Sequence, residues 1–164
     1  MRILGLSFQF HDAAATVIED GEILYASHSE RYSKEKNDPF LNHEMIADCL
    51  KFGKPDVIAL HEKSWAKKLR NIYAGNWRAL TEPTMERWIK EFFPELAGIP
   101  IKSYWHHETH AAAGVLTSKF DNCAVMVIDA IGEFDTASIW HWKEGTLKKV
   151  HSVKFPRSLG LFYS

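Results

Sequence analysis

The sequence has little cysteine, no long apolar run and almost no net charge. Its two cysteines, Cys49 and Cys123, lie in apolar periodic segments and cannot by themselves form a disulfide framework or a zinc ribbon. We interpret both as reduced core residues. The net charge of -1 argues against general nucleic-acid binding, which usually needs a basic face. No apolar run approaches roughly 18 residues and no signal peptide follows Met1, so we expect a cytoplasmic protein with no membrane partner.

Internal repeats and low-complexity linkers are also absent. A chain of 164 residues suits one domain, or the first part of a larger one. Residues 160–164 are apolar and carry neither charge nor helix cap, whereas natural domains tend to end in exposed polar residues. We therefore expect the chain to be the N-terminal portion of a longer protein.

The first part of the sequence predicts a meander of strands followed by a helix. The Asp20-Gly21 dipeptide is a strong hairpin signal between two apolar runs. The polar segment 29–41 is expected to be a loop. Asn42 is expected to cap a helix that runs to about Phe52. Strands are predicted at residues 2–8, 14–19, 22–28 and 57–60.

The rest of the sequence predicts more helices and a second group of strands. Residues 62–99 have helical spacing and carry three of the six tryptophans, with Thr84 as a cap, so they form either an inserted helical lobe or an ordinary helical connection. A helix is predicted from His106 to about Lys119. The order of elements predicts an α/β fold, an incomplete mixed sheet covered by helices, as in the ribonuclease H-like fold of actin-type ATPases. Strands are predicted at 101–104, 123–129, 136–142 and 147–155, with Glu144-Gly145 as the last turn.

Two histidines four positions apart form the sharpest chemical feature. On a helix, His106 and His110 lie on one face, about 5–6 Å apart at Cβ, so two imidazole nitrogens can bind one metal ion. Glu108 does not directly follow the first histidine, so the metalloprotease pattern is not met. Asp129 ends an apolar strand, where ligands of open α/β sheets bind, although turn carboxylates are also common there. Because the chain has nine histidines, the pair could also be two ordinary surface residues. If the three residues form a site, two histidines and a carboxylate suit Fe(II) or Zn²⁺.

Other polar segments have both a functional and a structural interpretation. His11 and Asp12 follow the first strand, where His11 could be a general base or hydrogen-bond donor, or part of a polar turn. Arg31 and Lys36 could bind phosphate or carboxylate, or form a solvated face. The serine and glycine of residues 158–160 could let backbone N–H groups approach an anion, or form a turn before a helix.

Together these segments resemble the O-carbamoyltransferases, the family that includes the nodulation-factor and aminoglycoside-antibiotic carbamoyltransferases. Their order and approximate spacing match from residue 3 to residue 164, and segment 62–99 contains no matching motif. The matching stretches are Ile3-Leu4-Gly5-Leu6-Ser7, His11-Asp12-Ala13-Ala14-Ala15, Asp20-Gly21-Glu22-Ile23, Ser29-Glu30-Arg31-Tyr32, His106-His107-Glu108-Thr109-His110-Ala111-Ala112, Asp129-Ala130-Ile131-Gly132-Glu133 and Ser158-Leu159-Gly160-Leu161-Phe162-Tyr163-Ser164.

The resemblance implies a reaction in two steps. Family members make carbamoyl-adenylate from carbamoyl phosphate and ATP in a separate domain, and a domain like this one transfers the carbamoyl group to a substrate hydroxyl. It implies a metal, thought to be iron, held by His106, His110 and Asp129. His11 would lie at the transfer site, where it accepts the hydroxyl proton or orients the carbamoyl group. Nucleotide or carbamoyl-phosphate contacts are further implied for Asp12, Arg31, Lys36, Gly132, Glu133, Ser158 and Gly160.

Two departures from the family pattern bear on activity. Ala130 stands where glycine is usual after the metal aspartate, and its methyl group restricts close backbone approach to a phosphate. The family chain is also much longer, with a further aspartate ligand, the rest of the nucleotide cleft and the adenylate-forming domain beyond the part matched here. We therefore expect that missing portion as a partner, and no turnover of carbamoyl phosphate and ATP by the 164-residue chain alone.

Three other functions fit parts of the pattern. The tRNA threonylcarbamoyl transferase shares the fold, the histidine pair and carbamoyl-adenylate chemistry, but segments 11–15 and 158–164 favour the O-carbamoyltransferases, and tRNA binding favours a more basic chain. A binding or regulatory module could keep the fold without catalysis. An actin-like sugar kinase needs a glycine-rich phosphate loop, which the sequence does not contain. The acceptor stays open among sugars, antibiotics, nucleosides and modified bases.

Overall fold

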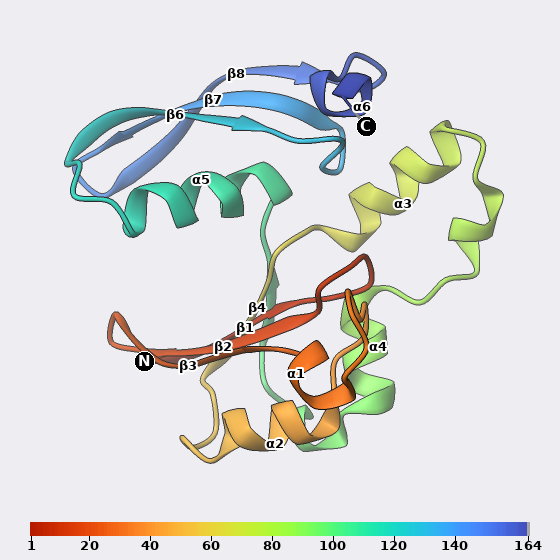
Figure 1. The fold of residues 1–164 in the computed structure, drawn as a ribbon, viewed down its shortest axis with the longest axis vertical. Coiled ribbons are helices and arrows are strands. Elements are labelled where there is room, and N and C mark those ends of the chain that lie inside the picture. The colour runs from red at the N-terminus through yellow and green to blue at the C-terminus, as the bar shows by residue number, and fades with distance from the viewer. Residues whose placement is uncertain (164) are drawn as a thin grey trace. The chain divides into compact units, whose positions relative to one another are not determined.

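The computed structural model describes residues 1–163, and Ser164, the last residue of the motif at 158–164, lies outside them. The chain divides into two compact units (Figure 1). The first unit consists of Met1–His61 and Glu82–Ser103, and the second consists of Glu62–Thr81 and Tyr104–Ser164.

The first unit is built on a mixed five-stranded sheet with the order β3-β2-β1-β4-β5. Strands β1, β2 and β3 form the predicted antiparallel meander, and β4 and β5 add to β1 in parallel. The predicted Asp20-Gly21 turn is confirmed, since both residues have the positive φ that a tight hairpin requires. The strands are β1 Arg2–Ser7, β2 Ala14–Glu19, β3 Glu22–His28, β4 Val57–Leu60 and β5 Ile101–Ser103.

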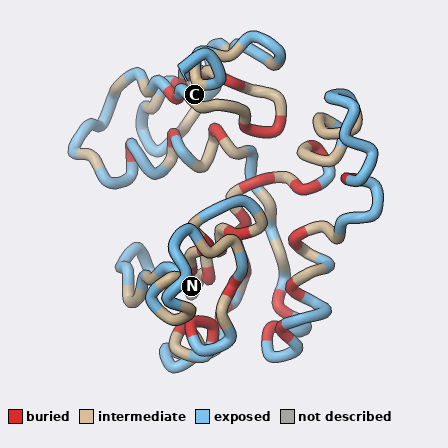
Figure 2. Tube along the Cα trace, turned by 45° about the vertical axis from the view of Figure 1, so that its right-hand side comes forward, coloured by how far each residue is buried: buried red, intermediate tan, exposed pale blue. Residues whose placement is uncertain are grey.

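Helices cover this sheet and close a large apolar core. The side chain of Asn42 accepts hydrogen bonds from the N–H groups of Glu44 and Met45, which confirms the predicted cap of α2. Thr84 likewise caps α4. Buried positions follow the strands and the helix faces turned toward them (Figure 2). The helices of the first unit are α1 Glu30–Ser33, α2 His43–Leu50, α4 Met85–Phe92 and the 3-10 turn η2 Pro94–Leu96.

The segment predicted to be a loop, residues 29–41, contains the short helix α1, so that prediction was wrong at its start. Ser29 is fully buried and its N–H bonds to the carbonyl of Ala13. The Tyr32 hydroxyl donates to Asp48 of α2 over 2.6 Å. Tertiary contacts therefore fix a single helical turn, which is too short for apolar periodicity to reveal.

The second unit contains a separate antiparallel sheet, β6-β7-β8, which the sequence did not distinguish from the first. The predicted hairpin is confirmed, with Glu144 and Gly145 both at positive φ in its turn. Helix α5 contacts all three strands. The elements are α3 Ser64–Tyr73, the 3-10 turn η1 Trp77–Leu80, α5 His106–Leu116, β6 Asn122–Ile128, β7 Asp135–Lys143, β8 Thr146–Lys154 and α6 Leu159–Tyr163.

The α/β class and the mixed sheet with flanking helices are confirmed. Segment 62–99 is helical, as predicted, and its two parts belong to different units. Its interpretation as an insertion stays a prediction. Within residues 1–163, no helix has the length and apolar composition needed to cross a bilayer.

Candidate metal centre

Helix α5 carries the two histidines of the candidate centre in its first turns. Because four positions on a helix make about one turn, the imidazoles of His106 and His110 lie on the same face. Their Nε2 atoms are 3.0 Å apart, with the ring planes at 72°. The structure thus brings together the pair that the sequence predicted.

Asp129 brings a carboxylate to the same point from the end of β6. Its Oδ2 atom lies 2.8 Å from Nε2 of His106, and its Oδ1 atom accepts a hydrogen bond of 2.6 Å from the N–H of Ala130. The ligand atoms of Asp129, His106 and His110 all lie within 4.8 Å of one another. Two imidazole nitrogens and a carboxylate oxygen form a donor set that suits Fe(II) or Zn²⁺.

Electrostatics favours the protonation states that metal binding requires. The hydrogen bond from His106, helped by the N–H of Ala130, lowers the pKa of Asp129 to about 2 against the opposing effect of burial. Burial lowers the pKa of His110, and the neighbouring His106 lowers it further. Near pH 7 the site therefore offers an ionised carboxylate and a neutral His110 imidazole, the forms that bind a cation.

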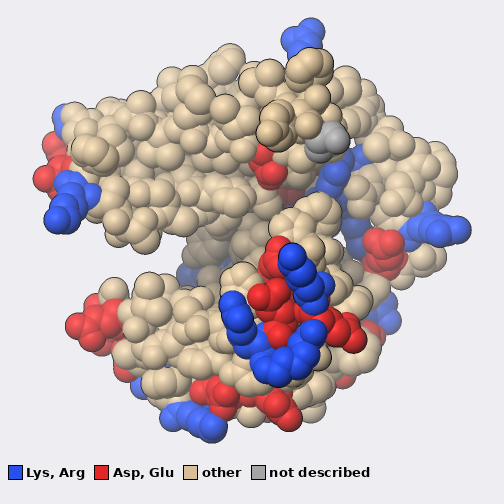
Figure 3. Space-filling model, in the orientation of Figure 1, with Lys and Arg blue, Asp and Glu red and all other residues tan. Residues whose placement is uncertain are grey.

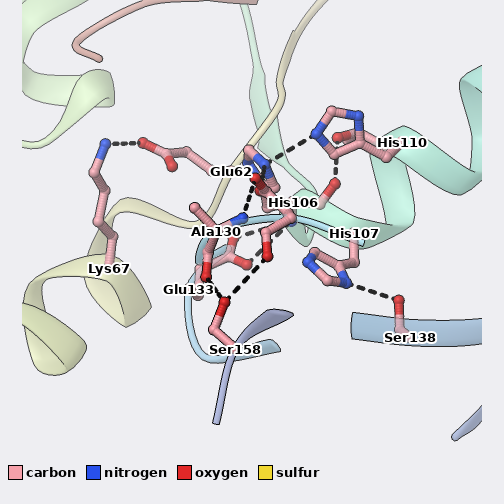
Figure 4. A network of polar contacts seen from close by, with 11 residues as sticks. Glu62, Lys67, His106, His107, His110, Ala130, Glu133, Ser138 and Ser158 are labelled. Atoms are coloured by element: carbon pink, nitrogen blue, oxygen red, sulfur yellow. Dashed lines mark hydrogen bonds and ion pairs between the residues drawn. The ribbon is translucent and has the colours of Figure 1, made fainter. Parts of the chain in front are cut away.

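Glu133 is buried beside the start of α5. Its carboxylate accepts a hydrogen bond of 2.7 Å from the N–H of Lys63. Both of its oxygens also lie 3.1 Å from the backbone nitrogen of His106, whose N–H they accept (Figure 4). Glu133 is 3% exposed, so these backbone donors replace the water that a charged group would otherwise need. The structure thus shows a protein contact for a residue that the resemblance had associated with nucleotide binding.

The segment before α6 packs against the backbone that carries Asp129. The Ser158 hydroxyl donates to the carbonyl of Ala130 over 2.6 Å (Figure 4). A Cβ atom on Gly160 would lie 2.5 Å from the carbonyl oxygen of Asp129 and 2.6 Å from the nitrogen of Ala130. Only glycine permits this approach. The two residues predicted to contact a nucleotide therefore support the loop that holds the carboxylate.

Comparison with known proteins assigns this chain to a family. Residues 58–164, about two thirds of the chain, match the family model described as Carbamoyltransferase N-terminus. The chain belongs to the carbamoyltransferases. The family resemblance of the sequence motifs is thereby confirmed.

Two curated relatives are much longer than this chain. An uncharacterized protein of Synechocystis sp. is 31% identical over an alignment 188 residues long, which covers 99% of this chain and 31% of that protein. Nodulation protein NolNO of Sinorhizobium fredii is 23% identical over 165 residues, which cover 93% of this chain and 24% of that protein. The chain thus spans about a quarter to a third of the length of these relatives.

A crystal structure of an uncharacterized protein with similarity to peptidase YEAZ, from Pseudomonas aeruginosa, aligns with this carbamoyltransferase chain at a TM-score of 0.41. The two are 15% identical, and the alignment covers 94% of this chain and 66% of the other.

A buried polar network next to the centre was not predicted. His107 follows a candidate ligand directly and is 2% exposed, with its Nδ1 atom 2.7 Å from the hydroxyl of Ser138 (Figure 4). The indole N–H of Trp140 donates to the same hydroxyl over 2.7 Å. Burial lowers the pKa of His107. The only sequence signal was the adjacent histidine pair, which forces one ring to point away from the ligand face of α5.

Of the other predicted residues, Gly132 lies in the second unit, whereas His11, Asp12, Arg31 and Lys36 lie in the first. The exposed His11 ring hydrogen-bonds to Asp12 through Nδ1, at 2.7 Å. Arg31 is exposed and lies 3.8 Å from Glu30, and Lys36 is also exposed. Basic and acidic side chains are interspersed on the face of this unit drawn in Figure 3. Their proposed roles with substrate or phosphate stay predictions.

Proposed function

We propose that this chain is the metal-binding part of an enzyme that transfers a carbamoyl group from carbamoyl-adenylate to a hydroxyl of a small-molecule or nucleoside-type acceptor. The observation that carries the proposal is the convergence of His106, His110 and Asp129 in a chain of the carbamoyltransferase family. Carbamoyl phosphate and ATP would supply the carbamoyl-adenylate. The rest of such a protein, including an adenylate-forming domain, would be the partner of this part.

The three donors fit a divalent cation, for which we favour Fe(II) over Zn²⁺. His106 and His110 would supply imidazole nitrogens and Asp129 a carboxylate oxygen, with Asp129 held in place by the N–H of Ala130. When bound, the cation would supply Lewis-acid stabilisation of the negative charge that develops on the carbamoyl oxygen and on the leaving AMP.

The transfer replaces the mixed-anhydride bond of carbamoyl-adenylate with the ester bond of a carbamate. The acceptor oxygen forms a bond to the carbamoyl carbon, the bond between that carbon and the phosphate oxygen breaks, and AMP leaves with the bonding electrons. The hydroxyl proton needs an acceptor, and we assign this role to His11. The alternative role of His11 is to orient the carbamoyl group. Because Nδ1 of His11 faces Asp12, its Nε2 is the nitrogen that would take the proton.

We further propose an actin-like ATPase arrangement of the ribonuclease H-like type. The antiparallel meander of β1 to β3, continued by the parallel strands β4 and β5 and flanked by helices, supports this assignment. Asp12, Arg31 and Lys36 remain the proposed contacts to nucleotide or carbamoyl phosphate, with Gly132 as a further candidate.

Metal content is the first test of this function. The chain is purified anaerobically, and iron and zinc are measured by elemental analysis for the wild type and for His106→Ala, His110→Ala and Asp129→Ala. We expect close to one ion per wild-type chain and its loss in each variant. His141→Ala, which changes an exposed histidine of β7, is the matched control and should keep the metal.

An activity assay then tests the incomplete site. With carbamoyl phosphate, ATP and a hydroxyl acceptor, we expect no turnover by the 164-residue chain alone. A wild-type chain that folds but binds no metal would contradict the metal-dependent function. Turnover by the chain alone would contradict the need for a further domain.

A further inference from the structure

We propose that Glu133 is a positioning residue that sets the spacing between the two histidines and Asp129, and that metal binding depends on its carboxylate. This inference rests on the proposed function, since it concerns the same centre. Glu133 lies four positions after Asp129, in the loop between β6 and β7. That loop therefore supplies one metal ligand directly and fixes the helix that bears the other two.

The first step is the cap of α5. His106 is the first residue of the helix, so its N–H has no partner within the helix. The residue before it, Trp105, has an indole side chain that offers no hydrogen-bond acceptor. The Glu133 carboxylate takes the capping place at 3.1 Å, where its negative charge also interacts favourably with the helix dipole.

The second step is the close packing of the loop on the helix. The loop is closed by a hydrogen bond of 2.8 Å from the N–H of Gly132 to the carbonyl of Asp135. A Cβ atom on Gly132 would lie 3.3 Å from Cβ of His106 and 3.0 Å from the ring of His107. The backbone of the loop thus lies against the helix beside the first ligand, and a shift of Glu133 would be transmitted to that ligand.

The third step is the tie to α3. The same carboxylate accepts the hydrogen bond from the N–H of Lys63, immediately before α3 begins at Ser64. Arg70 of α3 interacts electrostatically with Glu133 and with the buried Glu62. A single carboxylate therefore joins the metal loop, the helix α5 and the start of α3, all within the second unit.

The alternative is that Glu133 only stabilises the fold. The two roles are separated by a spectroscopic measurement, because the visible absorption of Co(II) reports the geometry of its ligands. The 164-residue chain is titrated with Co(II) as wild type, Glu133→Ala and Glu133→Gln, and each melting temperature is recorded. Ser138→Ala is the matched control, because it removes a buried hydrogen-bonding group of the same unit that contacts none of the three ligand side chains.

We expect Glu133→Ala to weaken Co(II) binding about 10- to 100-fold and to alter the absorption spectrum. Glu133→Gln, which keeps an oxygen acceptor, should weaken it less. Ser138→Ala should lower the melting temperature while leaving both affinity and spectrum unchanged. Two outcomes would overturn this inference while leaving the proposed metal function standing, provided that His106→Ala and Asp129→Ala abolish binding. One is that folded Glu133→Ala binds Co(II) with wild-type affinity and spectrum. The other is that Ser138→Ala shows the same spectral change as Glu133→Ala. A folded wild-type chain that binds no Co(II) would overturn both the inference and the proposed metal function.

Discussion

The two units bury different kinds of side chain. The core of the first unit is apolar and continuous, with Leu4, Met45 and Ile58 fully buried between sheet and helices. The apolar core of the second unit is much smaller and centres on Ala111, Val127 and Trp140. Among residues 1–163, Ser29 is the one buried polar side chain of the first unit. The others belong to the second unit and are Glu62, Ser64, His107, Glu133, Thr136 and Ser138.

This difference indicates a division of physical roles. Apolar burial is non-directional, so the first unit can be stable without any particular polar contact. Buried polar groups are favourable only when their partners are in place, so the second unit depends on geometry. Such directional contacts suit the proposed role of this unit, in which His106, His110 and Asp129 would be held at fixed distances. We therefore expect the second unit to respond most to small displacements of its backbone. The stability of the first unit should respond most to the loss of buried apolar volume.

The largest effect is expected from Gly160→Ala in the second unit. The added methyl group would meet backbone atoms of Asp129 and Ala130 at 2.5 to 2.6 Å, and backbone cannot move aside as a flexible side chain can. We expect complete loss of bound metal and a lower melting temperature, measured by elemental analysis and circular dichroism.

Gly114→Ala is the control, since the same methyl group on α5 would meet Val125 at an ordinary 3.8 Å. That variant should keep its metal and should be stabilised slightly by the higher helix propensity of alanine. Metal retained in Gly160→Ala would show that the packing of this segment does not define the site.

In the first unit, Leu4→Ala tests the apolar core. Leu4 is fully buried in β1, so we expect its truncation to lower the free energy of unfolding by about 2–5 kcal/mol in urea denaturation. Metal content per folded chain should stay at the wild-type level. Ile23→Ala, on the exposed part of β3, should cost no more than about 0.5 kcal/mol. A metal loss in folded Leu4→Ala would contradict the division between the units.

A smaller effect is expected at the cap of α2. Asn42→Ala removes the acceptor for the N–H groups of Glu44 and Met45 and should cost about 1 kcal/mol of stability. Asn42→Asp should restore most of this loss, because aspartate caps equally well. Equal destabilisation by both substitutions would show that the side-chain oxygen is not the source of the effect.

The smallest perturbation is chemical labelling of the two cysteines. Burial raises the pKa of Cys49 to about 12, and the thiol is 1% exposed, whereas Cys123 is only partly buried. Because the thiolate is the reactive form, a raised pKa leaves Cys49 protonated at pH 8 and still largely so at pH 10. Iodoacetamide should modify Cys123 in the native chain and both cysteines after denaturation. Equal native labelling rates would indicate that the core of the first unit opens readily.

Prediction from sequence succeeded where the signal is local. The cap at Asn42, the turn at Asp20-Gly21 and the spacing of His106 and His110 all depend on residues within one helical turn or one hairpin. It failed for α1, a turn fixed by the contact of Tyr32 with Asp48, and for the division of the strands into two sheets. Strand pairing joins segments that no periodicity relates.

The sequence by itself determined most of the helices and strands, the candidate ligand residues and the family of this chain, because side-chain chemistry and short-range periodicity depend directly on the order of residues. Only the tertiary structure decided which neighbours hold the ligands. Glu133 meets Lys63 across 70 positions and Ser158 meets Ala130 across 28. Such contacts depend on how the chain returns on itself, so no local pattern in the sequence could reveal that Glu133 and Ser158 also bond to the protein backbone beside the candidate metal ligands.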